Sequence, residues 1–176
     1  MEKELIRDAE ASAETHITPV LVVFQSLIAE PRDCKEHYRN GARHRGVYTV
    51  QSDQGGLSVY CDMLSEPGYI WTLLMSYSLD NVTNHPSKFR TSMLKEDSPF
   101  QEDTPNWSGY RMSKNQMKWI EGRSTIWRIT CSFEQSYKID HRDYIRAALT
   151  SLNPILFYGY NKCRKVRPSH FNPIYN

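Results

Sequence analysis

The sequence predicts an α+β fold built as one domain within a chain of 176 residues. Short strand patterns and short helix patterns follow one another without the regular strand–helix alternation of a doubly wound sheet. A hairpin signal stands near the start, with strands at 46–51 and 57–61 joined by turn residues at 52–56. Hydrophobic residues make up 39% and charged residues 24%, which is typical of a folded globular chain rather than a disordered one.

Residues 1–31 are predicted to be a leader or linker, and residues 32–176 the domain. Residues 17–28 are apolar but too few to span a membrane. They are either the apolar part of a secretory signal, with Ala29 near the cleavage point, or an ordinary buried strand or helix, or the stub of a wrongly assigned start. The net negative charge of residues 1–16 argues against a signal, which needs a positive leader.

The first elements of the domain are a short helix and the hairpin. Asp33 is a good N-cap for a helix over Cys34–Asn40, and Gly41 is a good stop for it. The strand at 46–51 is rich in β-branched and aromatic residues. A third, more buried strand is expected over Ile70–Tyr77.

The second half predicts a less regular succession of elements. Residues 80–110 are polar and predict a long excursion with little regular structure. Ser113 and Gln116 form a capping-box pattern for a helix that ends at Gly122. The elements expected after it are a strand over Thr125–Phe133, a helix over Asp143–Leu152, a short strand over Ile155–Tyr158 and a basic tail over 161–176.

The charge balance excludes several classes of function. The chain has 22 basic and 20 acidic residues, a net charge of +2, whereas nucleic-acid-binding domains usually carry a strongly basic face. No phosphate loop, helix-turn-helix or Cys/His finger pattern is present. We therefore expect no nucleic-acid partner and no membrane span.

Four cysteines, Cys34, Cys61, Cys131 and Cys163, allow three disulfide connectivities. Their order and the hairpin favour Cys34–Cys61 and Cys131–Cys163. Bridges closing loops of about 28 and 33 residues would each stabilise the fold by roughly 3–4 kcal/mol. Reduced thiols are the main alternative. A zinc site that uses Cys34, His37 and Cys61 is a weaker one, because structural zinc sites usually combine two closely spaced ligand pairs.

Two glycosylation sequons occur within the polar excursion, at Asn81 and Asn106. Such triplets are frequent by chance, and Trp107 in the middle of the second makes Asn106 the poorer acceptor. Together with the cysteines they favour an extracellular chain.

Four motifs, in order and at fitting spacing, resemble the start of a fibrinogen C-terminal-like domain. They are Arg32-Asp33-Cys34-Lys35-Glu36, Gly46-Val47-Tyr48-Thr49-Val50, Val59-Tyr60-Cys61-Asp62-Met63 and Gly68-Tyr69-Ile70-Trp71-Thr72-Leu73. The resemblance implies a small N-terminal helix-plus-hairpin subdomain, with Trp71 buried beside it, followed by a partial mixed sheet with short helices. One departure is that Gly68 alone precedes Tyr69, where the family usually has several glycines.

The resemblance also implies a function, that of a secreted, disulfide-bonded recognition module without catalytic residues. Its ligands would be glycans or extracellular proteins, as in lectin-like innate defence. Alternatives are a matrix or adhesion module, or a truncated product that lacks the ligand site. The calcium loop and ligand pocket of the family lie in its C-terminal part, and no Asp-x-Asp loop follows Cys163. We therefore expect no metal, no cofactor and no carried-over ligand residue, and leave the oligomeric state open.

Four weaker constellations each have an ordinary structural explanation. Residues 140–143 suit helix capping better than acid–base chemistry. The basic group around Cys163 and the acidic group of Glu96, Asp97, Glu102 and Asp103 suit solvated surfaces. Exposed aromatic residues of the excursion either stack on sugar rings or, as we favour, anchor the loop to the core; they are Phe100, Trp107 and Tyr110.

Overall fold

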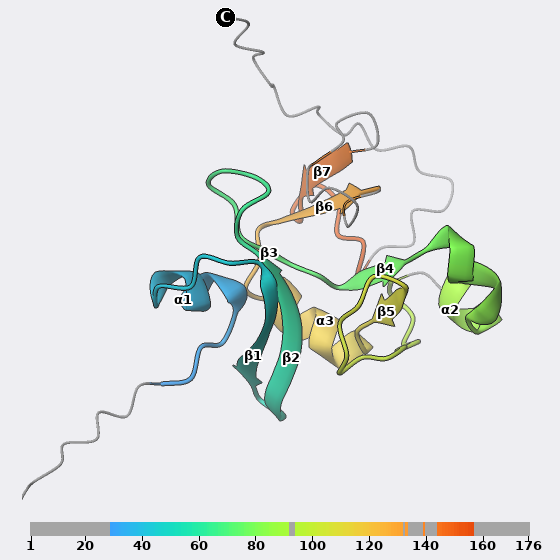
Figure 1. Ribbon diagram of the computed structural model, residues 1–176, viewed down its shortest axis with the longest axis horizontal. Helices are drawn as coiled ribbons and strands as arrows, with labels where there is room; N and C mark the ends of the chain where they lie inside the picture. Colours follow the sequence, from blue (N-terminus) through green and yellow to red (C-terminus); the bar gives the residue numbers. More distant parts are fainter. Residues whose placement is uncertain (1–28, 92–93, 132, 134–138, 140–143, 157–176) are drawn as a thin grey trace, which may run out of the picture.

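The computed structural model describes residues 29–91, 94–131, 133, 139 and 144–156, and it has the predicted α+β class (Figure 1). Within these residues the strands form three small antiparallel sheets, β1–β2–β3, β4–β5 and β6–β7, in place of one mixed sheet. The elements are α1 (Cys34–Arg39), β1 (Gly46–Ser52), β2 (Gly55–Asp62), β3 (Trp71–Thr72), β4 (Met75–Tyr77), the 3-10 helix η1 (Leu79–Asn84), α2 (Ser87–Thr91), β5 (Gly109–Arg111), α3 (Lys114–Glu121), β6 (Ile126–Thr130) and β7 (Tyr144–Ala148).

Helix α1 begins and ends where its sequence predicts. The Asp33 side chain accepts a hydrogen bond of 2.7 Å from the Glu36 amide, which satisfies one of the free donors of the first turn. Asn40 is the C-cap, and Gly41 follows it with a φ of 101°, a conformation that favours glycine. The predicted helix over 34–40 is therefore confirmed to within one residue.

The hairpin provides one wall of the core. Strands β1 and β2 pair in register from Gly46–Cys61 to Ser52–Gly55, as predicted. Alternate residues of β2 point inward, since Leu57, Val59 and Cys61 are all buried. They belong to one cluster with residues of β5, α3 and the turn after β7, namely Tyr110, Met117, Ile120 and Ile155. The hairpin and α3 therefore share a single core.

The strand expected over Ile70–Tyr77 is two strands in different sheets, which corrects the prediction. The Leu73 amide still donates to Tyr60 of the first sheet, whereas the Leu74 carbonyl accepts from Met112, which follows β5. The chain therefore crosses between sheets at these two leucines. Both leucines are half-buried and pack against the core, so one apolar run serves both sheets.

The polar segment 80–110 is more regular than the sequence predicts. It contains most of η1, all of α2 and the start of β5. Rings of His85, Phe89 and Phe100 pack at centroid distances of 4.8–5.2 Å and hold this part together. Gly109 lies against them, and a Cβ there would come within 2.5 Å of the His85 ring. These aromatic contacts hold the segment in a regular structure, and its mostly polar composition gives no sign of them.

Helix α3 confirms its capping-box prediction. The Ser113 side chain accepts from the Gln116 amide, and the Gln116 side chain accepts from the Ser113 amide at 2.9 Å. Met117 and Ile120 lie on the inner face and are buried, and Gly122 is the C-cap. The opposite face of this helix remains open to solvent.

The helix predicted over Asp143–Leu152 is wrong, because residues 144–148 form strand β7. It pairs with β6 from Ile126–Ala148 to Thr130–Tyr144, and alternation turns Tyr144 and Arg146 to one face. The contacts of those two side chains, described below, outweigh the helical preference of the local sequence. Residues 155–156 lie in a turn rather than a strand. The predictions for residues 1–28, Asp143, 157–158 and 161–176 fall outside the described residues.

Candidate functional site

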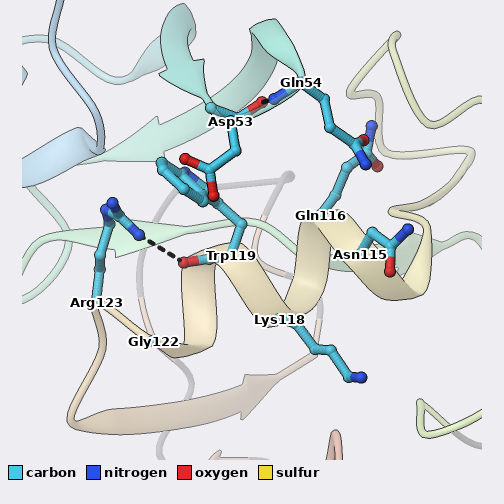
Figure 2. A pocket seen from close by; sticks show the side chains of 9 residues that line it. Asp53, Gln54, Asn115, Gln116, Lys118, Trp119, Gly122 and Arg123 are labelled. Atoms are coloured by element: carbon cyan, nitrogen blue, oxygen red, sulfur yellow. Dashed lines mark hydrogen bonds between the residues drawn. The ribbon is translucent and has the colours of Figure 1, made fainter.

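A polar groove lies between the β1–β2 turn and the outer face of α3 (Figure 2). It encloses about 520 Å³, a volume that suits a small ligand. The turn contributes a hydroxyl, a carboxylate and an amide, and the helix contributes two amides, an aromatic ring and two cationic side chains. The lining residues are Ser52, Asp53, Gln54, Asn115, Gln116, Lys118, Trp119, Gly122 and Arg123.

The two cations of the groove do not face its centre. In Figure 2 Lys118 points away from the turn. The Arg123 guanidinium lies 3.5 Å from the centre of the Trp119 ring and donates to the Trp119 carbonyl at 3.4 Å. Asp53 and Gln54, by contrast, extend from the turn toward the helix. Amides and one carboxylate therefore dominate the middle of the groove.

Both walls of the groove are held by local bonds. Ser52 Oγ donates to the Gly55 carbonyl and accepts from the Gln54 amide, which fixes the turn. The side-chain oxygen of Gln116, Oε1, accepts the capping-box hydrogen bond from the Ser113 amide. This bond fixes the side chain and leaves its NH₂ group as the end that can contact a ligand. The backbone of both walls is therefore held in place, whereas all the residues that line the groove are exposed or half-buried.

A second cluster of polar residues is buried and joins the hairpin to β6–β7. Asp62 ends β2 and is 3% exposed, and Glu66 is 5% exposed. Arg128 of β6 donates to Asp62 at 2.6 Å and to Ser65 Oγ at 2.9 Å, and it lies 3.4 Å from Glu66. Arg146 of β7 donates to the other oxygen of Glu66. Each buried carboxylate therefore has a cation as partner.

The register of β6 and β7 explains why these carboxylates are needed. Arg128 and Arg146 are directly opposite each other across the strand pair. Like charges in that position repel unless anions lie between them. Glu66 contacts both and also accepts from the Tyr144 hydroxyl at 3.0 Å. The cluster therefore fixes how the β6–β7 sheet docks on the β2–β3 connection.

Two aromatic rings complete this cluster. Trp71 is buried, as predicted, and its ring stacks on Tyr69 at 5.7 Å. The guanidinium of Arg128 lies 4.4 Å from the Trp71 ring centre, and that of Arg146 lies 4.6 Å from the Tyr69 ring centre. These cation–π contacts cover the faces of both guanidinium groups while their edges bond to carboxylates.

The surroundings shift two pKa values in the cluster. Burial acts to raise the pKa of Asp62, but hydrogen bonds from Ser65 and Arg128 outweigh it and hold that pKa below its ordinary value. Burial and the hydrogen bond to Glu66 raise the pKa of Tyr144 to about 12. The cluster is therefore most stable with the carboxylate ionised and the phenol neutral.

The structure joins Cys34 and Cys61 in a disulfide, with Cα atoms 5.6 Å apart. Their pairing is confirmed, and neither residue can be a zinc ligand. Cys131 is exposed and forms no disulfide among the described residues. Its expected partner, Cys163, lies outside them, so that pairing stays a prediction.

The two sequons differ in what surrounds them. The side chain of Asn81 is outside the described residues, although its backbone lies in η1. The Asn106 amide donates to Gln101, Thr104 and Gly109, and its oxygen accepts from Ser108 and Gly109. A glycan on Nδ2 would replace one of the two amide hydrogens that this network uses. Glycosylation at both sites stays a prediction.

Replacing Asn106 by alanine is expected to lower the free energy of unfolding by about 1–3 kcal/mol, because the N–H and carbonyl of the buried Gly109 lose this partner. Ser108→Ala removes the same sequon but only one hydrogen bond, and it should cost less than about 1 kcal/mol. Denaturant unfolding of both variants separates the structural role from glycosylation. Equal losses in the two would contradict the structural role.

The aromatic residues of the excursion anchor it, as favoured. Tyr110 is fully buried in the core, Phe100 packs on Phe89, and Trp107 packs on Tyr60 and Phe133. The acidic group is dispersed: Asp97 accepts from the Lys114 amide at 2.8 Å, and the Glu96 backbone carbonyl accepts from Arg111. No group of three or more His, Cys, Asp or Glu that could hold a metal occurs among the described residues. Residues 140–143 and 162–167 lie outside them.

Sequence reasoning found neither the groove nor the buried cluster. The signal for the cluster was weak, since Asp62 and Arg128 are 66 residues apart and each is an unremarkable charged residue in sequence. The alternation of Tyr144 and Arg146 is typical of a strand with one polar inner face, whereas the prediction from sequence for this segment is a helix.

Comparison with known proteins identifies the family. The family model described as "Fibrinogen beta and gamma chains, C-terminal globular domain" matches residues 30–153. The chain is also similar to tenascin-R of Mus musculus, with 23% identity over 169 residues. That match covers 93% of this chain and 11% of tenascin-R, so the chain spans about a tenth of that relative's length. In the part of the chain that the structure describes, no helix is long and apolar enough to cross a membrane. The match over 30–153, together with the disulfide that links helix α1 to the hairpin, shows that the chain belongs to the fibrinogen C-terminal domain family.

Proposed function

We propose that the chain is a secreted, extracellular recognition module that binds glycan or protein ligands without covalent chemistry, in the manner of a lectin of innate defence. The observation that carries the proposal is a rigid scaffold beneath an open polar surface. The Cys34–Cys61 disulfide ties α1 to the hairpin, and the Asp62–Arg128 pair ties the hairpin to β6. Disulfides persist in oxidising compartments, which fits an extracellular site of action.

The first test is binding by the oxidised full-length chain. We expect saturable binding to a subset of saccharides on a glycan array, or to a purified extracellular protein on a sensor surface. The same protein should show no hydrolysis of glycoside or ester substrates. If the chain bound neither to the glycan array nor to the sensor surface, while a cooperative unfolding transition proved that it is folded, the proposal would be overturned.

The second test addresses the compartment. In the unreduced native chain we expect Cys34 and Cys61 to resist alkylation, and to react only after reduction and unfolding. Alkylation of both thiols in freshly isolated protein would argue against an oxidising compartment.

A matrix or adhesion role is the second candidate. The similarity to tenascin-R favours it as much as it favours the lectin-like role. Tight binding to a matrix protein, with no response on the glycan array, would select this candidate.

A further inference from the structure

We propose that α1 and the loop after it form a docking surface for an acidic protein segment in an extended conformation. This inference rests on the proposed function and deepens it, because it assigns the chemistry of one protein ligand and the residues that bind it. The surface, the basic row, consists of the exposed side chains of Lys35, Arg39 and Arg43. Helix α1 lies at the outside of the molecule, beside the hairpin (Figure 1).

Positive charge is concentrated in this part of the chain. Residues 32–45 contain five Lys or Arg side chains and two carboxylates, whereas the whole chain has a net charge of only +2. This short segment therefore carries more net positive charge than the entire chain. A local excess of this kind attracts anions during diffusional encounter, most strongly at low ionic strength.

Both carboxylates of the segment are already engaged. Asp33 caps the helix by accepting from the Glu36 amide. Glu36 accepts from the amide and the guanidinium of Arg32 at 2.7–3.2 Å. Arg45 lies 3.6 Å from the buried Asp62. The three cations of the basic row, by contrast, form no ion pair with any residue that the structure describes, so their charges are available to a partner.

The Arg43 guanidinium is held in one orientation. Its Nη1 donates to the carbonyls of Tyr38 and Ala42 at 2.5 and 2.8 Å, and its Cζ lies 4.2 Å from the centre of the Tyr38 ring. The two bonds close the C-terminal turn of α1, and this structural role uses only Nη1. The Nε and Nη2 groups are left, and side by side they match the two oxygens of a carboxylate.

The loop between α1 and β1 is also fixed. The Ala42 amide donates to the His37 carbonyl at 3.0 Å. The Tyr48 hydroxyl of β1 donates to the His44 carbonyl at 2.9 Å. The backbone that carries Arg43 therefore lies between two anchored points, and it does not have to become ordered when a ligand binds.

The spacing of the basic row favours an extended acidic segment. Lys35 and Arg39 are four residues apart on α1, so they share a face and are separated by about 6 Å along the helix axis. Alternate side chains of an extended chain lie on one face, about 6.6 Å apart. Acidic residues at every second position would therefore lie opposite the row, and the next one would reach Arg43. A sulfated polysaccharide offers negative charge without this side-chain repeat.

The experiment measures the binding of labelled peptides to the oxidised 176-residue chain by fluorescence anisotropy. In the first peptide glutamate alternates with threonine, and the second has the same composition with its glutamates in one block. Heparin represents the sulfated polysaccharides. We expect the chain to prefer the alternating peptide, with an affinity that falls as the ionic strength rises, because salt screens exposed charge pairs.

Two variants and one control locate the surface. Lys35→Gln/Arg39→Gln should bind the alternating peptide about tenfold more weakly, at nearly unchanged thermal stability. The matched control Lys88→Gln/Lys118→Gln removes the same charge from exposed positions on α2 and α3, and should stay within about twofold of the wild type. Arg43→Lys keeps the charge but loses the planar fork, and should weaken binding about threefold to fivefold.

The outcomes separate this inference from the proposed function. If Lys35→Gln/Arg39→Gln bound like the wild type, for example through the basic residues 162–167, the basic row would be overturned and the proposed function would stand. Binding of heparin but of neither peptide would overturn the acidic protein segment. Equal affinity for the two peptides would overturn its extended conformation. If the folded wild type bound no peptide, the inference would fail, whereas the glycan array and the protein sensor surface decide the proposed function separately.

Discussion

Replacing Arg128 by methionine is expected to lower the free energy of unfolding by about 3–5 kcal/mol. The Arg128 side chain is 9% exposed, and its partners are the buried carboxylates of Asp62 and Glu66. Methionine fills much of the same volume but leaves Asp62 ionised without its closest cation. Arg45, whose Nε lies 3.6 Å from Asp62 Oδ1, and Arg146 beside Glu66 still compensate part of the charge. The penalty is therefore the cost of two buried carboxylates that have lost their shared cation, rather than the value of one ion pair. Urea unfolding of wild type and variant measures it.

Arg123 offers a matched control, because its guanidinium also lies over a tryptophan ring, Trp119. Arg123 is exposed, and its guanidinium donates to the backbone carbonyl of Trp119. Arg123→Met should therefore cost less than about 1 kcal/mol. Similar losses in the two variants would show that contact with a ring, and not charge compensation, dominates at Arg128.

The pH dependence provides an independent check on the buried cluster. The pKa of Asp62 is lower in the folded than in the unfolded chain, so its contribution is present above the ordinary value of about 4. That contribution is lost as the pH falls through the depressed folded value. The pKa of Tyr144 is raised to about 12, so its contribution is present below about pH 10 and lost as the pH rises toward 12. Stability should decline in both directions, and the difference between wild type and Arg128→Met should shrink in acid. A constant difference down to pH 2 would contradict this assignment.

Local patterns predicted three elements of the domain well: helix α1, the β1–β2 hairpin and helix α3. An N-cap at Asp33, turn residues at 52–56 and a capping box at Ser113 each act through bonds spanning only a few residues. The Cys34–Cys61 pairing followed from the hairpin, because the strand end at Cys61 returns to the start of α1. In these elements the sequence neighbours are also the spatial neighbours, so a single sequence is sufficient.

The failures lie where distant residues decide the structure. Residues 144–148 were predicted helical, yet Tyr144 and Arg146 are held in a strand by Glu66, 78 and 80 residues away. The groove likewise forms between the β1–β2 turn and α3, which are far apart in the sequence. Neither periodicity nor composition predicts a contact between such distant segments. For the site, the sequence predicted the disulfide-bonded hairpin and the family but none of the groove residues.

The Cys34→Ala/Cys61→Ala variant is expected to lose about 3–4 kcal/mol of unfolding free energy, from the loop-closure entropy of a bridge between residues 27 apart in sequence. The control Thr72→Val keeps the disulfide and removes the hydroxyl contact to Cys34 Sγ at 3.1 Å. It should cost less than about 1 kcal/mol. Chemical denaturation of the three proteins, with and without reductant, makes the comparison. An unchanged midpoint in the double variant would contradict the expected role of the bridge.

The bridge and the buried cluster should not act independently, because Asp62 directly follows Cys61. The disulfide fixes the end of β2, and that end places Asp62 and the turn that carries Ser65 before Arg128. Without the disulfide the cluster is already weakened, so Arg128→Met should cost less than in the wild type. A double-mutant cycle, measured in a stabilising osmolyte so that all four proteins remain folded, should give a coupling of about 0.5–3 kcal/mol. Strict additivity would mean that the hairpin holds Asp62 in place without the disulfide.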